Sequence, residues 1–309
     1  MEINLDLGLN LAGLELKNPI LNASGTFGFG LEYAPYGDVT RLGALVTKGL
    51  SLLPRSGNPM PRITETAFGM LNSVGLQNNG VDYFITRILP NMPWRQVPVI
   101  VNIFADNLEN FSKLAKVITS QDSVAALEVN ISCPNVSQGG LIFGLDPAMT
   151  RQVTAAVKQN AHGKPVFVKL TPSAQDIGQI AKAAQAGGAD ALTCVNTLPG
   201  MAVDLESRRP LLANVTGGLS GPPLKPVALR CVWQVRQAVD LPIIGVGGIG
   251  TARDILEFIM VGASAVQVGT AALSDPRNIF ALIEDLPVEC AKLGINDLED
   301  FRGSLLAPS

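Results

Sequence analysis

The chain has 309 residues, of which 47% are hydrophobic and 16% are charged, and its formal net charge at pH 7 is −3. This composition supports a large buried core, and the weakly acidic balance argues against a nucleic-acid partner or binding to an anionic membrane surface. The N-terminus has no basic targeting region and no apolar run reaches the roughly 20 residues that a bilayer span needs, so we expect a soluble, cytoplasmic protein.

Eight short runs rich in β-branched residues recur along the chain, each followed by a polar or glycine turn and then a helical pattern. They predict strands at residues 19–24, 44–48, 97–103, 126–132, 165–170, 190–196, 241–248 and 264–270. Amphipathic segments such as 176–189 and 251–263 predict helices between the strands. Alternating buried strands and helices are typical of a parallel sheet, and eight such units predict an α/β protein with a (β/α)8 TIM barrel. We expect residues 1–309 to form a single domain.

Two long intervals interrupt this alternation. Residues 49–96 separate the second and third predicted strands, and residues 197–225 separate the sixth strand from its helix. Both intervals are rich in Gly and Pro and both follow the carboxyl end of a strand, where barrels build their active sites. We therefore predict functional loop insertions at the C-terminal face.

Polar residues and glycines occupy the carboxyl ends of all eight predicted strands. They are Ser24, Lys48, Asn102, Asn130, Lys169, Asn196, the pair Gly247 and Gly248, and the pair Gly269 and Thr270. A single Asn or Lys at a strand end is usually a turn former or a solvated tip. Because the carboxyl ends of all strands meet at one mouth of a barrel, eight such ends together predict a ligand site.

The segment "GVGGIG" at 245–250 matches the pattern G-x-G-x-x-G. It follows the seventh strand and no acidic residue lies about 20 positions later, so we reject it as a dinucleotide-binding fingerprint. In a barrel, the loops after strands seven and eight commonly bind phosphate through backbone N–H groups. These glycines, with the glycine-rich segment 217–226, therefore predict a phosphate site, although tight turns alone would also explain them.

Lysines at strand ends inside a barrel are costly unless a charge or a polar ligand meets them. Lys48 and Lys169 therefore indicate an anionic or electron-rich ligand. A phosphate site combined with central lysines suits flavin mononucleotide, FMN, whose reduced ring carries negative charge that Lys169 could stabilise. The alternative is that both lysines pair with core carboxylates, as in Schiff-base or isomerase barrels.

A cysteine is the candidate for the catalytic base in this chain. The chain has four cysteines with no CxxC pair, which argues against a metal or iron–sulfur site, and its one histidine, His162, precedes the fifth strand at the opposite rim. Cys133 lies just past a strand end and can act as nucleophile or proton acceptor if its pKa is lowered. Cys194, Cys231 and Cys290 are expected to be buried apolar thiols.

Asparagines add hydrogen-bonding capacity beside Cys133. The four candidates are Asn72, Asn130, Asn135 and Asn196. Their amides donate and accept hydrogen bonds without carrying charge, which suits a ligand with several amide edges, such as a pyrimidine ring.

The motifs "NASGTFGFG", "TKGLSLLPRSGNPMPRITET", "GMLNSVGLQNNGVD", "NISCPN", "VKLTP" and "GGLSGPPLKPVALR" occur in this order between about residues 5 and 285. Together they resemble the catalytic subunits of class 1B, NAD-linked dihydroorotate dehydrogenases. The resemblance implies a flavoprotein oxidoreductase of pyrimidine biosynthesis that oxidises dihydroorotate to orotate, with FMN on this chain. Cys133 would remove the C5 proton while the C6 hydride passes to FMN. The family also implies a partner subunit that carries FAD and a [2Fe–2S] cluster and passes electrons to NAD, with a homodimer of this chain inside a heterotetramer.

The resemblance also assigns site residues position by position. Substrate contacts carry over to Lys48, Asn72, Ser73, Val74, Gly75, Leu76, Asn130, Asn135, Asn196 and Thr197. Flavin contacts carry over to Ser24, Lys48, Gly49, Asn102, Asn130, Lys169, Val195, Gly221, Gly247, Gly248, Gly269 and Thr270. No metal ligand is expected on this chain.

Other functions remain open from the sequence. The soluble fumarate-dependent class 1A enzymes share the cysteine, whereas the membrane-bound class has serine at the position of Cys133. NAD-linked dihydropyrimidine dehydrogenase subunits typically have histidine where this chain has Asn135. A cofactor-free isomerase or lyase barrel and a non-catalytic ligand-binding barrel are the remaining alternatives. The segment "QNNGVD" departs from the more usual "QNPG", which we expect to change loop stiffness and not chemistry.

Overall fold

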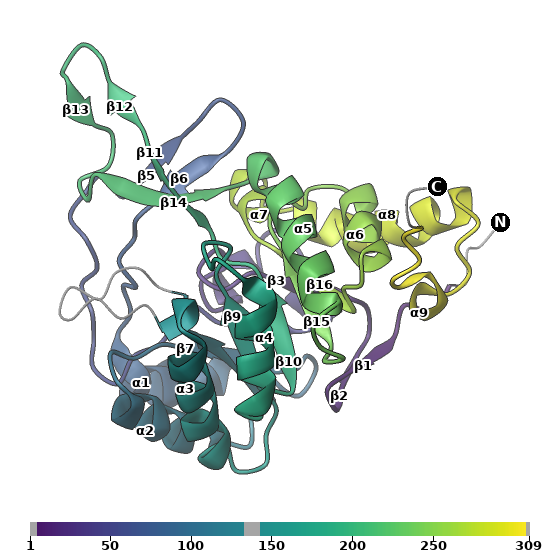
Figure 1. Cartoon of the computed structure of the whole chain (residues 1–309), viewed down its shortest axis with the longest axis horizontal. Coiled ribbons are helices and arrows are strands. Elements are labelled where there is room, and N and C mark those ends of the chain that lie inside the picture. The colour runs from purple at the N-terminus through teal and green to yellow at the C-terminus, as the bar shows by residue number, and fades with distance from the viewer. Residues whose placement is uncertain (1–4, 133–142, 307–309) are drawn as a thin grey trace.

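The computed structural model describes residues 5–132 and 143–306, and its central feature is an eight-stranded parallel sheet (Figure 1). The strands are β3 (Ile20–Asn22), β4 (Leu45–Val46), β7 (Val99–Ile103), β8 (Ala126–Asn130), β9 (Val166–Leu170), β10 (Ala191–Cys194), β15 (Ile243–Val246) and β16 (Ala265–Val268). Each lies inside one of the eight predicted ranges, and the order around the sheet follows the chain. The prediction of a (β/α)8 barrel is confirmed.

The first and second strands close the barrel. A parallel bridge joins Leu21 to Ala44, and the Gly43 N–H donates to the Ile20 carbonyl at 2.9 Å. The buried amide of Asn22 then takes the place of the next ladder bonds: its Nδ2 donates to the Val46 carbonyl at 2.7 Å and its Oδ1 accepts from the Val46 N–H at 2.9 Å. One side chain thus completes the seam between the two shortest barrel strands.

Alternate residues of the strands face inward and outward. The inward set includes Ile100, Ala126 and Phe167, which form a small apolar cluster with Leu11 and Leu16. Those two leucines come from the hairpin of β1 (Leu9–Leu11) and β2 (Leu14–Leu16), which lies at the end of the barrel away from the inserted strands (Figure 1). This hairpin closes the N-terminal end of the barrel, and in the described part of the chain the cavity lies at the carboxyl ends of the strands.

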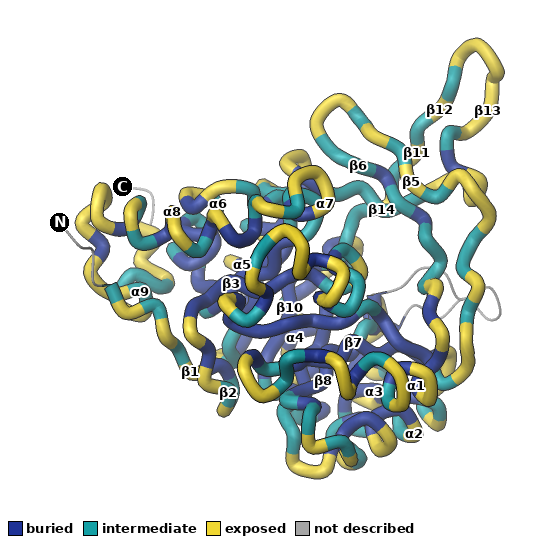
Figure 2. The backbone as a smooth tube through the Cα atoms, turned by 180° about the vertical axis from the view of Figure 1, so that it is seen from behind, coloured by how far each residue is buried: buried dark blue, intermediate teal, exposed yellow. Residues whose placement is uncertain are grey.

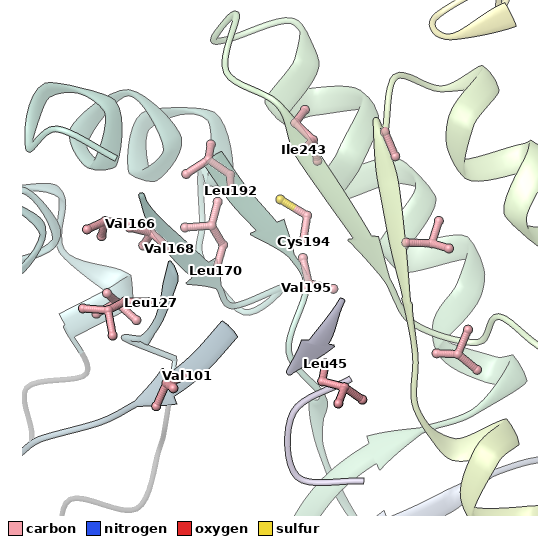
Figure 3. Packing of buried hydrophobic residues seen from close by; sticks show 14 of the residues in the cluster. Leu45, Val101, Leu127, Val166, Val168, Leu170, Leu192, Cys194, Val195 and Ile243 are labelled. Carbon is pink, nitrogen blue, oxygen red and sulfur yellow. The ribbon is translucent and has the colours of Figure 1, made fainter. Parts of the chain in front are cut away.

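The outward set of strand residues joins the main hydrophobic core. Val101, Leu127, Val168 and Leu192 belong to it and are fully buried (Figure 3). The helices that cover the barrel supply the other side of this core. Four of the described α-helices begin at an aspartate or asparagine whose side chain caps them, such as Asp176, which accepts from the Gln179 N–H at 3.1 Å. The α-helices are α1 (Gly80–Tyr83), α2 (Leu108–Thr119), α3 (Pro147–Gln159), α4 (Ile177–Ala186), α5 (Lys225–Arg236), α6 (Ala252–Met260), α7 (Thr270–Ser274), α8 (Asn278–Lys292) and α9 (Leu298–Phe301).

The helical pattern is incomplete after the first barrel strand. Short 3-10 turns at Leu31–Tyr33 and Val39–Arg41 link β3 to β4, whereas α1 continues directly into a π-helical turn (Phe84–Ile88) and a 3-10 turn (Leu89–Asn91) before β7. The expectation of a helical segment in every unit is therefore wrong between β3 and β4. Glycines at 25, 28 and 30 have positive φ, a conformation that interrupts a helix.

The two long intervals form a second, antiparallel sheet over the open end of the barrel. Its order is β11 (Leu198–Met201), β14 (Thr216–Ser220), β6 (Met70–Asn72) and β5 (Ile63–Glu65), with the separate hairpin β12 (Val203–Asp204) and β13 (Arg209–Pro210) beyond it. The register pairs Gly218 with Asn72 and Ser220 with Met70. Figure 2 shows buried barrel strands and exposed tips on both inserted hairpins. The predicted insertions at the C-terminal face are confirmed, and they also pair with each other, which the sequence did not predict.

No helix in the described parts of the chain combines the length and apolar character needed to cross a membrane.

The seam made by Asn22 gives a stability prediction. Asn22→Ala should leave the Val46 N–H and C=O buried without partners and lower the free energy of unfolding by about 2–4 kcal/mol. Urea unfolding followed by circular dichroism measures this change. Asn91→Ala is the matched control, because Asn91 is exposed and donates only to the Arg87 carbonyl on the same short helix. Equal midpoints for the two variants would contradict the role of Asn22.

Candidate active site

A cavity of about 560 Å³ lies at the carboxyl ends of the barrel strands, roofed by the inserted sheet. The residues predicted from the sequence that line it are Ser24, Lys48, Gly49, Asn72, Ser73, Val74, Gly75, Leu76, Asn102, Asn130, Lys169, Val195, Asn196, Thr197, Gly221, Gly247, Gly248, Gly269 and Thr270. Cys133 and Asn135 lie outside the described residues. Every other predicted site residue is thus brought into one cavity of a size typical of cofactor sites, and their individual roles stay predictions.

Lys169 stands at the floor of this cavity, near the barrel axis. It is almost fully buried on β9, and its Nζ lies 3.0 Å from Ser24 Oγ, 3.4 Å from Gln267 Oε1 and 3.7 Å from Glu128 Oε1. Of the two possibilities left open by the sequence, pairing with a core carboxylate is observed for Lys169, and contact with a ligand in the cavity stays a prediction. Lys169 pairs with a core carboxylate, and the same ammonium group lines the cavity.

Glu128 lies one layer deeper in the barrel than the cavity floor. Its side chain is 0% exposed and accepts hydrogen bonds from Asn102 Nδ2, Thr193 Oγ1 and Gln267 Nε2. Burial alone would raise the pKa of this carboxyl group, but the Lys169 charge and these hydrogen bonds together hold the pKa below its usual value. The group is therefore a carboxylate at neutral pH.

Lys48 occupies a different position, on the wall of the cavity after β4. Its side chain is half-buried, and its backbone N–H donates to the Gly28 carbonyl at 2.9 Å. Burial lowers the pKa of the Lys48 ammonium group, with Arg62 adding to the effect and Glu32 opposing it. An anionic ligand in the cavity would favour the charged form of Lys48.

Two asparagines and a serine form a connected group on the same wall. Ser132 Oγ donates to Asn130 Oδ1 at 2.7 Å and accepts from Asn196 Nδ2 at 2.6 Å. Asn196 Oδ1 in turn accepts the N–H of Thr197 at 2.9 Å. These bonds fix the orientation of both amides, and both asparagines line the cavity.

A glycine-rich rim forms the opposite side of the cavity. Gly247, Gly248 and Gly221 all have positive φ, and a Cβ on Gly248 would lie 2.7 Å from the Lys225 Cβ and 2.9 Å from the Gly221 carbonyl oxygen. Only glycine allows the backbone to pass this closely. Asp254 on α6 braces the rim by accepting the Gly250 N–H at 2.9 Å and pairing with Lys225 at 2.6 Å. Backbone N–H groups on a rim without side chains suit a phosphate group.

Several residues that line the cavity were not predicted from the sequence. Ser132, Met70, Thr216 and Ser220 line the cavity, and Glu128 supports it from below. Ser132 could have been found from its place in "NISCPN", two positions after Asn130. The roof residues carry no local signal, because only the pairing of β6 with β14 brings them over the barrel.

The remaining cysteines and the histidine lie where the sequence placed them. Cys194 on β10, Cys231 on α5 and Cys290 on α8 are fully buried, and burial raises the pKa of each thiol, for Cys290 to about 11. His162 is exposed and lies beside Thr119, with Nδ1 3.0 Å from Thr119 Oγ1, away from the cavity lining. None of these four residues is placed to act on a ligand in the cavity.

Comparison with known proteins places the chain in a family. A sequence model described as dihydroorotate dehydrogenase matches residues 6–288. The chain is 59% identical to a protein of Solidesulfovibrio magneticus and 55% identical to one of Maridesulfovibrio salexigens, covering 98% of this chain and 99% and 100% of the relatives. Both relatives are named as the catalytic subunit of dihydroorotate dehydrogenase B (NAD(+)).

A solved structure shares the fold. It is a DHODH from Eimeria tenella crystallised with ferulenol, which superposes with a TM-score of 0.80 at 24% sequence identity, over 97% of this chain and 88% of that one. The likeness supports the barrel architecture, while the sequence matches carry the family assignment. The chain belongs to the dihydroorotate dehydrogenase family of oxidoreductases.

Proposed function

We propose that this chain is the catalytic subunit of an NAD-linked dihydroorotate dehydrogenase, which oxidises dihydroorotate to orotate in pyrimidine biosynthesis. The observation that carries the proposal is the division of one cavity into three parts: a glycine-rich backbone rim, a buried cation at the barrel axis, and a wall of amide and ammonium groups. The two relatives described above are named as this catalytic subunit, and the chain matches both over nearly their full length.

The residues present fit FMN. The rim at Gly221, Gly247 and Gly248, with Gly269 and Thr270 beside it, suits the phosphate. Lys169, Asn102 and Ser24 would face the flavin ring from the barrel axis, with Gly49 and Val195 completing the site. FMN, when bound, supplies an acceptor for the hydride.

The wall near Lys48 fits the substrate. Dihydroorotate carries one carboxylate and several amide edges, so it needs a cation and neutral hydrogen-bonding groups. Lys48 supplies the cation, and Asn72, Asn130, Asn196 and Thr197 supply donors and acceptors, with the 73–76 segment passing over the same space. The locked amides of Asn130 and Asn196 would hold the ring in one orientation.

The proton acceptor in this proposal is Cys133, which lies outside the described residues, as does the further substrate contact Asn135. Its sequence neighbour Ser132 lines the cavity, so the described part of the motif "NISCPN" ends at the substrate wall. A cysteine can take the C5 proton near neutral pH when its pKa is lowered by its surroundings. The membrane-bound class has serine at this position.

A partner subunit completes the proposed route for electrons. The four cysteines are dispersed and include no CxxC pair, so an iron–sulfur relay belongs on another chain. We expect that partner to carry FAD and a [2Fe–2S] cluster and to reduce NAD, in a cytoplasmic heterotetramer built on a dimer of this chain. The main alternative is the class 1A reaction, in which fumarate accepts the electrons.

Purification with and without the partner tests this assignment. The lone chain should be yellow and should reduce its flavin with dihydroorotate, yet turn over poorly with NAD, because electrons need a relay from FMN. Adding the partner should restore NAD-dependent turnover, measured as NADH formation at 340 nm. Rapid fumarate-dependent turnover by the lone chain would assign class 1A, and full-rate NAD reduction by the lone chain would refute the partner. A colourless protein would refute the flavin and favour a cofactor-free barrel.

Cys133→Ser tests the proposed base. The variant should keep FMN and orotate affinity but reduce its flavin roughly 10²–10⁴-fold more slowly near neutral pH, because a hydroxyl is a much weaker acid than a thiol. Stopped-flow absorbance of the flavin measures this rate, and the residual rate should rise with pH. Cys290→Ser makes the same atomic change far from the cavity and should leave the rate intact. Wild-type speed in Cys133→Ser would remove Cys133 as the base.

The lowered pKa of Lys48 predicts a pH dependence of binding. The ammonium loses its proton at a lower pH than an ordinary lysine, so orotate affinity should fall as pH rises through that lowered pKa. At the ordinary lysine pKa of about 10.4 more than half of the Lys48 side chains have lost the proton, so the Kd there should be more than twofold higher than at pH 7. Lys48→Arg keeps its charge over this range and should show a much flatter profile relative to its own neutral value. Parallel profiles, followed by titration of flavin absorbance, would exclude Lys48 as the titrating group.

A further inference from the structure

Glu128 is a buried charge that the proposed reaction does not use. It lies on β8 two residues before Asn130, so it shares the inward face of the strand, but its side chain is 0% exposed and is not part of the cavity lining. A charge buried this completely is unfavourable unless other groups compensate for it. Four side chains from four other strands do so: Asn102 on β7, Lys169 on β9, Thr193 on β10 and Gln267 on β16.

The carboxylate decides how two amides are oriented. It can only accept hydrogen bonds, so Asn102 turns its Nδ2 to Glu128 Oε1 at 2.7 Å and Gln267 turns its Nε2 to Glu128 Oε2 at 2.7 Å. Each amide must then direct its oxygen elsewhere. Gln267 Oε1 faces Lys169 Nζ at 3.4 Å, and Asn102 presents Oδ1 toward Gly49 on the cavity lining. Replacing the carboxylate would remove the reason for both orientations.

The same carboxylate holds Lys169 and offsets part of its charge. The distance of 3.7 Å between Lys169 Nζ and Glu128 Oε1 is longer than a hydrogen bond but close enough for strong attraction in a solvent-free interior. Ser24 Oγ, at 3.0 Å, holds the ammonium group from the cavity side. Lys169 thus lies between a buried anion below and the cavity above.

We propose that Glu128 is a positioning residue that tunes the reduction potential of the flavin through Lys169, by holding its ammonium group and the Gln267 and Asn102 amides in place. The inference rests on the proposed flavin site. Reduction adds negative charge to the flavin ring, and a cation beside the ring favours that state. Glu128 weakens this effect by neutralising part of the Lys169 charge, so its carboxylate keeps the potential lower than Lys169 alone would set it.

Glu128→Gln tests the inference in the holoenzyme. Loss of the carboxylate leaves Lys169 uncompensated, so the equilibrium between oxidised and reduced FMN should shift toward reduced FMN by at least tenfold, about 30 mV for a two-electron couple. The midpoint potential is measured by spectroscopic titration against a dye. Glu128→Asp, which keeps the charge, should stay closer to wild type. Thr193→Val removes one hydrogen bond to Glu128 without changing charge and should move the equilibrium less than twofold.

A double variant shows whether the effect passes through Lys169. Lys169→Met should lower the potential, and without its cation the buried Glu128 should take up a proton. Adding Glu128→Gln to Lys169→Met should therefore change the equilibrium less than twofold. If Glu128→Gln alone does not fold, the comparison of Lys169→Met with the double variant still tests the inference, because removing both charges leaves no uncompensated ion.

The outcomes distinguish a failure of the role of Glu128 from a failure of the proposed function. An unchanged potential in Glu128→Gln, or a tenfold effect of the same change in the Lys169→Met background, would overturn the role of Glu128 acting through Lys169. A wild-type protein that holds no flavin would overturn the proposed function itself. A flavoprotein that reduces normally with dihydroorotate, yet shows no shift in Glu128→Gln, would leave the function intact and remove only the inference.

Discussion

The alternation of side chains along closed parallel strands is the constraint on which the cavity depends. On β8, Ala126, Glu128 and Asn130 all face the barrel axis, at three successive depths. The deepest layer is apolar, the middle layer carries charge and amides, and the uppermost layer lines the cavity. Because side chains fill the interior of a barrel of eight strands, polar groups in the middle layer must find their partners on neighbouring strands. The floor of the cavity is therefore a network in which each member limits the orientation of the next.

Such a network adds little to the free energy of unfolding compared with apolar packing. Replacing a buried ion pair with well-packed apolar side chains is often neutral or stabilising, and the barrel already has an extensive apolar core outside its strands. What the Glu128 network supplies is orientation. It fixes which amide atom faces Lys169 and which faces the cavity, and it does so with residues from five strands whose backbones are held by the ladder. Precise placement of polar groups on rigid elements is what a cofactor site requires.

Some of this arrangement could be predicted from the sequence, and the limits have physical reasons. Continuous apolar runs predicted the strand ranges, and the polar or glycine ends of all eight barrel strands line the cavity as expected, because the carboxyl ends of parallel strands meet at one mouth of a barrel. The roof was not predictable, since β6 and β14 pair across about 150 positions and each is too short to carry a periodic pattern. Glu128 was also missed. A glutamate inside an apolar run carries no sign of its partners, which come from four other strands.

Floor and roof differ in how firmly they are held. The floor strands are buried along almost their whole length, whereas β14 and β5 are half-buried or exposed, and Phe68 and Leu205 at the tips of the inserted segments are 78% and 86% exposed (Figure 2). Elements with few buried contacts open at lower free energy than the core. A ligand that must reach a closed floor can therefore enter by local movement of the inserted sheet, while the charges and amides beneath keep their positions. The two demands on the site, access and fixed geometry, thus fall on different parts of the chain: residues 49–96 and 197–225 above, and the strand ends below.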